Sequence, residues 1–136
     1  MPSIRRVSVI LSAVLLAACS SLVHGPDRPP TESEIIGTYD MGHAGFDETL
    51  QLHQDGTYTR TLHGHLGQNS KDFHGTWRID GKHLFFGPVP EQQTVSSLVQ
   101  AEAFFHRHKP AFVRTQDLKA DKVHEWWVYE RRENGQ

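Results

Sequence analysis

The feature that most constrains this chain is a pair of Asp-Gly sequences, Asp55-Gly56 and Asp80-Gly81. Each stands between two short segments in which apolar and polar residues alternate, and this arrangement is the strongest local signal for a β-hairpin. The segments that we expect to be strands are 48–53 and 57–62 around the first turn, and 75–79 and 83–86 around the second. Two hairpins in about 40 residues predict an antiparallel meander and therefore a mainly β fold.

The alternation in these segments predicts which side chains form the core. Side chains on a strand point alternately to opposite faces, so residues two apart share a face. On the first hairpin, the core face would carry Leu50, Leu52, Tyr58 and Leu62. On the second hairpin, it would carry Trp77, Ile79, Leu84 and Phe86. Each hairpin would therefore bury one apolar face.

Three further strands are expected outside the hairpins. The first would cover residues 36–40, followed by a glycine-containing loop at 41–45. A short strand at 111–114 would lead through a polar turn at 117–122 into a closing strand at 123–131. The closing strand is apolar on both faces at a period of two, which predicts that it is either central in the sheet or covered by a helix.

The segment between the second hairpin and residue 111 has a different pattern. Its apolar residues Val95, Leu98, Val99 and Phe105 have helical spacing. Alanine and glutamate residues between them also favour a helix. We therefore expect one short helix near residues 94–108, ended by Pro110.

The N-terminal residues have the pattern of a secretory signal peptide. Arg5 and Arg6 precede an uncharged, mostly apolar run over residues 7–18. This run is shorter than the roughly 20 residues that a membrane-spanning helix needs, but it suits the apolar region of a signal peptide. It ends in two alanines, directly followed by Cys19, the single cysteine of the chain.

The sequence Leu16-Ala17-Ala18-Cys19 resembles the lipobox of bacterial lipoproteins, in which a leucine, a small residue and an alanine or glycine precede an invariant cysteine. The resemblance implies cleavage before Cys19, a thioether-linked diacylglycerol on its side chain and acylation of the new N-terminus. Several acyl chains anchor a protein stably where one does not. Ser20 follows the cysteine, in place of the Asp that resembles an inner-membrane retention signal, which favours an outer-membrane anchor facing the periplasm.

These patterns divide the chain into a lipoprotein signal peptide at 1–18, a lipidated tether at 19–33 and a single β domain at 34–136. Three prolines and a glycine would keep the tether extended and semi-rigid. A lone cysteine cannot form an internal disulfide. Two of the 14 Lys and Arg residues leave with the signal peptide, so 12 face 16 Asp and Glu residues, a net charge of −4. This balance argues against nucleic acid as a partner.

The hairpin motifs together resemble the small lipocalin-like β domains of bacterial envelope lipoproteins. The residues that carry the resemblance are Gly37-Thr38-Tyr39, the segment from Glu48 to Tyr58, Gly75-x-Trp77 and Leu84-x-Phe86. Copper-stress outer-membrane lipoproteins have a similar N-terminal domain, and the resemblance implies a lipocalin-like sheet or small barrel. That family has a Cys-x-x-Cys after its first strand, whereas the region from Met41 to Phe46 has no cysteine here. The resemblance therefore implies a fold without a thiolate copper site, and a fold alone does not imply a function.

Two His-x-His pairs, His63-x-His65 and His106-x-His108, are the candidate metal ligands. On a strand, residues i and i+2 share a face, where two imidazoles can bind one ion. Neutral imidazole suits zinc or copper, so a cofactor of this kind would be one of these metals. The alternative is that these are solvated loop histidines.

Four aromatic residues are the candidate ligand pocket: Tyr58, Trp77, Phe86 and Trp127. They would line an apolar cavity in an open barrel and would simply form the core of a small closed one. No serine lies in a Gly-x-Ser-x-Gly sequence and no glycine-rich phosphate loop is present, so no catalytic residue is predicted. We expect a non-enzymatic binding or interaction module, whose partner is an envelope protein or a small apolar ligand. The alternative is a histidine-based metal-binding or metal-stress lipoprotein.

Overall fold

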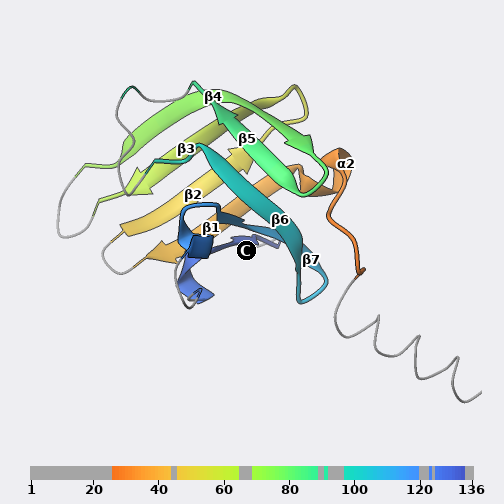
Figure 1. Ribbon diagram of the computed structural model, residues 1–136. Coiled ribbons are helices and arrows are strands. Elements are labelled where there is room, and N and C mark those ends of the chain that lie inside the picture. Colours follow the sequence, from red (N-terminus) through yellow and green to blue (C-terminus); the bar gives the residue numbers. More distant parts are fainter. Residues whose placement is uncertain are drawn as a thin grey trace, which may run out of the picture.

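The computed structural model describes residues 26–43, 46–64, 69–88, 91, 97–119, 123 and 125–133. Within this part of the chain, eight antiparallel strands close into one barrel (Figure 1). The elements are α2 (Glu32–Ile35), β1 (Gly37–His43), β2 (Phe46–Leu52), β3 (Thr57–His63), β4 (Lys71–Asp80), β5 (His83–Gly87), β6 (Gln100–His106), β7 (Lys109–Arg114), the 3-10 turns η1 (Asp117–Lys119) and η2 (Glu125–Trp127), and β8 (Val128–Arg131). The predicted antiparallel meander is confirmed, and pairing of β1 with β8 closes it into a barrel.

Both predicted Asp-Gly hairpins are confirmed. β2 pairs with β3 so that Leu52 lies opposite Tyr58, and β4 pairs with β5 so that Ile79 lies opposite Leu84. The glycines of the two turns have φ angles of +80° and +58°, a left-handed conformation that glycine adopts without steric cost. Turn chemistry therefore sets the register of both hairpins.

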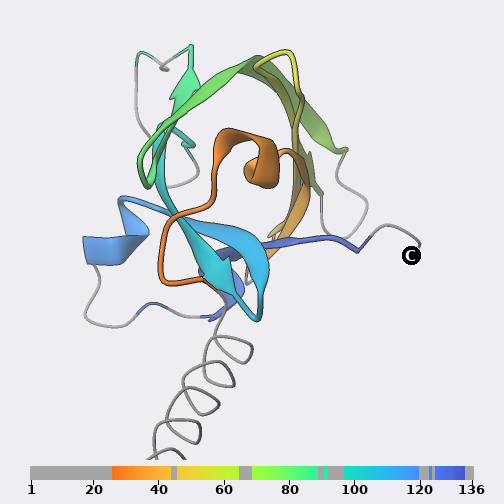
Figure 2. The same cartoon turned by 90° about the vertical axis from the view of Figure 1, so that its right-hand side faces the viewer.

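The two ends of the barrel differ. At one end, which we call the closed end, the turns at 53–56, 81–82 and 107–108 are short, and α2 lies within the outline of the barrel (Figure 2). Ile35 of α2 is fully buried there, and Tyr39 Oη donates a hydrogen bond of 2.6 Å to its carbonyl oxygen. At the opposite end, which we call the loop end, β1 leads into β2, β3 into β4, β5 into β6 and β7 into β8. Most of these connections are longer than the turns of the closed end.

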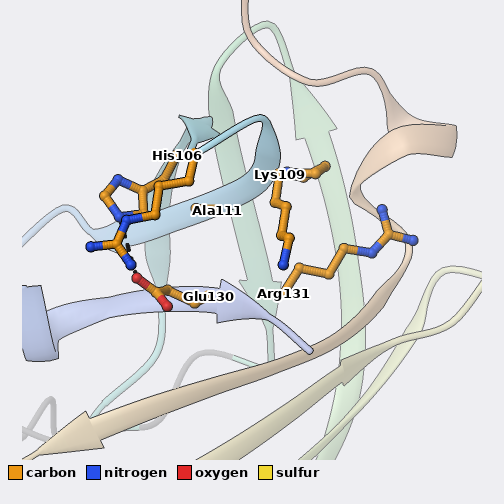
Figure 3. A pocket seen from close by; sticks show the side chains of 7 residues that line it. His106, Lys109, Ala111, Glu130 and Arg131 are labelled. Atoms are coloured by element: carbon orange, nitrogen blue, oxygen red, sulfur yellow. Dashed lines mark ion pairs between the residues drawn. The ribbon is translucent and has the colours of Figure 1, made fainter. Parts of the chain in front are cut away.

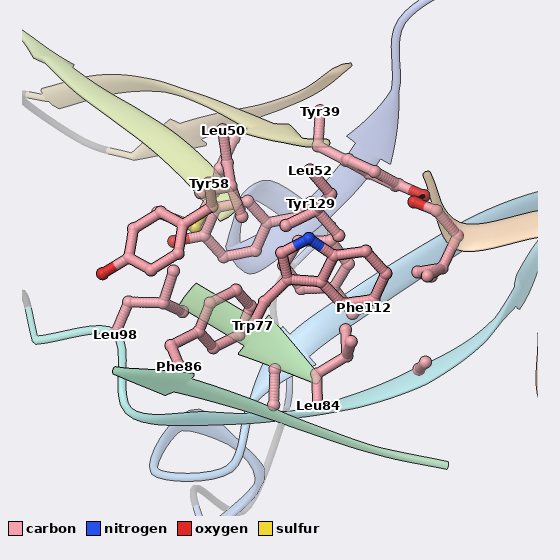
Figure 4. Close-up of a cluster of buried hydrophobic side chains, with 14 residues drawn as sticks. Tyr39, Leu50, Leu52, Tyr58, Trp77, Leu84, Phe86, Leu98, Phe112 and Tyr129 are labelled. Atoms are coloured by element: carbon pink, nitrogen blue, oxygen red, sulfur yellow. Dashed lines mark hydrogen bonds between the residues drawn. The ribbon is translucent and has the colours of Figure 1, made fainter. Parts of the chain in front are cut away.

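Apolar side chains from all eight strands and α2 fill the interior (Figure 4). The buried cluster consists of Ile35, Tyr39, Met41, Leu50, Leu52, Tyr58, Trp77, Leu84, Phe86, Leu98, Ala101, Ala103, Phe112 and Tyr129. It includes six of the eight residues predicted for the core faces of the hairpins. Ile79 is partly buried against the cluster, and Leu62 is half-buried. The period-two pattern therefore identifies the inward face of both hairpins.

Gly75 on β4 lies where the neighbouring strands leave no room for a side chain. A Cβ atom at this position would lie 1.8 Å from the carbonyl oxygen of Gly87 on β5 and 2.7 Å from Cε1 of Tyr58. No side chain fits at such distances. The glycine of the Gly75-x-Trp77 motif is therefore required by the packing of β4 against its neighbours.

The helix predicted near residues 94–108 is wrong for the described residues of that range. Residues 100–106 form β6, which pairs with β5 and β7, and residues 94–96 lie outside the described residues. The small side chains of Ala101 and Ala103 face the core, so the true apolar pattern has a period of two. Alanine favours helix locally, but pairing on both sides of β6 overrides this preference. Pro110, expected to end a helix, lies in β7.

The extents of other strands also differ from the prediction. The closing strand β8 begins only at Val128, because residues 125–127 form η2 and leave Trp126 51% exposed. β8 nevertheless pairs with β7 on one side and β1 on the other, as predicted for a strand that is central in the sheet. Tyr129 is in the core, and Val128 packs in a second buried cluster with Ala111 and Val113. β1 continues to residue 43, into the segment expected to be a loop, and β4 begins at residue 71 instead of 75, because these residues pair with β2 and β3.

Candidate functional site

A buried ion pair lies inside the barrel near the loop end. Glu48 on β2 and Arg60 on β3 are only 3% and 5% exposed, although charged side chains are almost never so deeply buried unless paired. The hairpin register explains their position. Glu48 precedes the inward-facing Leu50 by two residues, and Arg60 follows the inward-facing Tyr58 by two. The period-two pattern therefore contained this signal, but the prediction followed only the apolar residues.

The two charges are joined to each other and to a tyrosine, and we call Glu48, Arg60 and Tyr129 the Glu48 cluster. Arg60 Nε donates to Glu48 Oε1 at 2.5 Å, and Nη2 donates to Oε2 at 2.9 Å. Tyr129 Oη, from β8, donates to the same Oε1 at 2.5 Å. The bidentate pair and the hydroxyl satisfy both carboxylate oxygens, which makes the burial of the charge tolerable.

The surroundings of Tyr129 and Arg60 keep both side chains protonated at neutral pH. Burial raises the pKa of Tyr129 well above its usual value, and the negative charge of Glu48 raises it further, so the phenol remains a donor. Burial alone would lower the pKa of Arg60, but the hydrogen bonds and the charge of Glu48 outweigh burial and raise it. The arrangement keeps its protons and behaves as a fixed polar anchor.

An exposed aromatic ring lies over this cluster. The guanidinium carbon of Arg60 is 5.7 Å from the ring centroid of Phe73, on β4, which is 42% exposed. This distance is within the range of a cation–π contact. A second ion pair follows at the same end, where β7 leads into η1: Arg114 Nε donates to Asp117 Oδ2 at 2.7 Å. Phe73 and the Glu48 cluster, which we call the loop-end site, combine an exposed apolar ring with a rigid polar base.

The predicted aromatic pocket is mostly core. Tyr58, Trp77 and Phe86 are brought together among the buried side chains, with the Tyr58 and Phe86 rings edge-to-face at 5.4 Å. Trp77 Nε1 donates to the carbonyl oxygen of His53 at 3.0 Å, which satisfies the buried indole. Trp127 lies in η2 and is half-buried.

The candidate histidine ligands are separated by the fold. His63 lies at the loop end of β3, with Nε2 3.1 Å from Thr49 Oγ1. His106 lies at the closed end of β6, with Nε2 3.3 Å from Glu130 Oε1 (Figure 3). His108 lies in the next turn with a φ of +67°, so it does not share a strand face with His106. Within the described residues, no group of three or more His, Cys, Asp or Glu side chains is arranged to hold a metal ion.

Several predicted features lie outside the described residues. These are His65, Cys19, the signal peptide at 1–18 and the tether as far as residue 25. Among the residues that are described, no helix combines the length and apolar character needed to cross a membrane.

No protein-family profile matches the chain, and neither the curated proteins nor the solved structures include a significant match.

Proposed function

We propose that this chain is a lipid-anchored binding module of the bacterial envelope, without catalytic activity of its own. In this proposal the acyl chains on Cys19 hold it in the outer membrane, and the domain faces the periplasm. The position of the tether indicates how an anchored domain would be oriented. Residues 26–31 reach the barrel at the closed end, directly before α2, and the longer connections lie at the opposite end (Figure 1). The loop end would then point away from the membrane, as is common for binding loops on a rigid scaffold.

The packing of the interior favours a protein partner at the loop end over a small apolar ligand inside the barrel. The rings of Phe112 and Tyr129 stack at 4.5 Å, and those of Tyr39 and Phe112 lie at 4.8 Å, so these side chains fill space as a core does. Phe73, by contrast, exposes its ring beside the buried Glu48 cluster. Hot-spot residues of protein interfaces are often aromatic side chains that pack against rigid, desolvated groups.

Site-specific photo-crosslinking in intact cells tests this proposal. A photoreactive amino acid at position 73 should give a discrete protein adduct that tandem mass spectrometry can identify. The same amino acid at position 82, in an exposed turn of the closed end, is the matched control and should not give that adduct. A second pair of chains carries the photoreactive amino acid at position 71, with and without Phe73→Ala. Loss of the adduct in the Phe73→Ala variant would show that the ring of Phe73 contributes to binding of the partner. Adducts of equal yield from positions 73 and 82 would overturn the assignment of the loop end.

The anchor is tested separately by mass spectrometry of the purified protein. The expected mass is that of a chain beginning at Cys19 with a diacylglycerol and an additional acyl group. The protein should remain with the outer-membrane fraction, and Cys19→Ala should prevent acylation. An unacylated chain in the periplasmic fraction of cells would overturn the proposed anchoring.

A further inference from the structure

The turn between β6 and β7 brings several basic side chains together. Its sequence is His106-Arg107-His108-Lys109, four consecutive residues with basic side chains. Arg107 and His108 have φ angles of +49° and +67°. Hairpin turns with two such residues strongly prefer Asn-Gly, because other side chains are strained in this conformation. Strain of this kind often accompanies a functional demand on the side chains.

A small pocket lies beside this turn (Figure 3). It has a volume of about 90 Å³ and is lined by His106, Arg107, Lys109, Pro110, Ala111, Glu130 and Arg131. His106 and Glu130 lie on one side of it, and Lys109 and Arg131 on the other (Figure 3). The pocket is therefore built where the β6–β7 turn meets the end of β8.

The lining is positively charged overall. With the histidine neutral, three cations, Arg107, Lys109 and Arg131, face one carboxylate, Glu130. Glu133 pairs with Lys109, and Glu130 lies close to His106. Arg131 Nη1 donates to the carbonyl oxygen of Glu34 at 2.8 Å, so its hydrogen bond leaves its charge uncancelled. Among the described residues, no carboxylate lies within ion-pair distance of Arg107 or Arg131.

The tether reaches the barrel close to this pocket, and in Figure 2 its orange trace crosses β6 and β7. The guanidinium carbon of Arg28 lies 5.5 Å from the ring centroid of Phe105 on β6. Arg131, which lines the pocket, donates to the carbonyl oxygen of Glu34 in α2, directly after the tether. Seven residue steps separate Cys19 from Pro26, and an extended chain covers at most about 25 Å over that length. An acylated Cys19 would therefore hold this face of the barrel close to the phospholipid headgroups.

We propose that the pocket at the β6–β7 turn binds a phosphate group, and that the phosphate belongs to an anionic phospholipid of the anchoring membrane. Arg107 and Lys109 would donate charge-assisted hydrogen bonds to the phosphate oxygens. The choice of a lipid source rests on the proposed function, whereas the phosphate chemistry rests on the pocket itself. Binding would hold the closed end against the membrane and keep the loop end directed away from it.

Chemical footprinting of the mature full-length chain in phosphate-free non-ionic detergent tests the pocket. The rate at which an amine-reactive acetylating reagent modifies Lys109 is measured by mass spectrometry, with and without inorganic phosphate. Lys82 is an internal control, because it lies in another turn of the closed end and, like Lys109, pairs with a glutamate. Phosphate should slow the modification of Lys109 and leave Lys82 unchanged. The Arg107→Gln variant should need about ten times more phosphate for the same protection of Lys109, the effect expected for the loss of one charge-assisted hydrogen bond. The Lys82→Gln variant should need no more phosphate than the wild type.

A second arm identifies the source of the phosphate. The same chain is reconstituted into vesicles of neutral glycolipid, with or without phosphatidylglycerol. Protection of Lys109 by phosphatidylglycerol supports the lipid source, and protection by inorganic phosphate alone overturns that source but retains the pocket. Absence of protection in both arms, or equal protection of Lys82, overturns the inference. If Cys19 proves unacylated while free phosphate protects Lys109, the proposed anchoring fails and the pocket stands.

Discussion

Arg60 and Glu48 face each other inside the barrel and share two hydrogen bonds, of 2.5 and 2.9 Å. Both residues belong to the first Asp-Gly hairpin, so a local turn brings two opposite charges into the interior. A buried ion pair adds little stability compared with an apolar pair, because both ions lose their hydration. The role of such a pair is better understood as selecting one arrangement of the surrounding side chains than as adding stability. The pair fixes one geometry at the loop end, directly beside the exposed ring of Phe73.

Removing one member of this pair should be far more damaging than replacing the whole cluster. Arg60→Met leaves Glu48 as an unpaired buried charge, which is expected to cost about 3–5 kcal/mol of unfolding free energy. The triple variant Glu48→Leu, Arg60→Met, Tyr129→Phe removes every polar group of the cluster and should recover most of that loss. Urea unfolding of the two variants and the wild type measures the difference. A single variant that loses less than about 1 kcal/mol would show that water reaches the pair.

The two buried tyrosine hydroxyls should differ in their contribution to stability. Tyr129→Phe removes a hydrogen bond to a carboxylate, and Tyr39→Phe removes one to the neutral carbonyl oxygen of Ile35. Bonds to charged groups contribute about 1.5–3 kcal/mol, and neutral bonds about 0.5–1.5 kcal/mol. We therefore expect the larger loss for Tyr129→Phe in urea unfolding. Equal losses would show that the hydrogen bond from Tyr129 contributes no more than the one from Tyr39.

All three tyrosines of the chain should resist ionisation while the barrel is folded. Burial raises the pKa of Tyr39, Tyr58 and Tyr129 above the usual value of about 10. A raised folded-state pKa gives stability that is complete below pH 10 and is lost as the pH rises above it. Tyrosinate absorbance should therefore rise together with loss of the circular dichroism signal. A tyrosinate signal that appears well before unfolding would place one ring in solvent.

Local and non-local features of this chain differed in how well the sequence predicted them. The hairpins follow from Asp55-Gly56 and Asp80-Gly81, because turn conformation depends on a few adjacent residues. The strand at Gln100–His106 was missed, because Ala101 and Ala103 favour a helix locally and become strand only through pairing on both sides. Trp126 likewise lies outside the barrel, although a period-two pattern placed it in a strand.

The loop-end site shows the same division. Glu48 and Arg60 occupy inward positions of a hairpin that the sequence does predict, so their pairing could have been inferred from the register. Tyr129 could not, because it comes from β8, and 81 positions separate it from Glu48. Only closure of the barrel brings that hydroxyl to the carboxylate. The loop-end site therefore depends partly on a local hairpin and partly on closure of the barrel.

The contact between the tether and α2 should weaken in acid. Glu34 receives two hydrogen bonds from Arg28, of 2.7 and 2.8 Å, and two from Thr31, each of 2.9 Å. The bonds from Arg28, then those from Thr31, lower the pKa of Glu34 to about 2. A lowered folded-state pKa gives stability that is present above the unfolded value of 4.5 and is lost as the pH falls from there toward 2.

Carboxyl NMR on the protein should therefore detect protonation of Glu34 near pH 2. Glu34→Gln should remove part of the acid sensitivity of thermal unfolding over this range. Glu32→Gln, on the same helix, is the matched control for the loss of one acidic side chain. A Glu34 signal that protonates near pH 4.5 would mean that Arg28 does not hold the carboxylate in solution.

The motif glycine Gly75 gives the sharpest test of the barrel geometry. Gly75→Ala would put a Cβ 1.8 Å from the backbone carbonyl oxygen of Gly87, which cannot move without shifting β5. We expect a loss of about 3 kcal/mol or more of unfolding free energy. Gly42→Ala, on β1, is the control, because its Cβ would meet nothing within 4 Å. That variant should be neutral or more stable by about 0.5–1 kcal/mol, since alanine loses less backbone entropy on folding. Similar melting temperatures for the two variants would show that there is room for a side chain at position 75 between β4 and β5, which would contradict this packing.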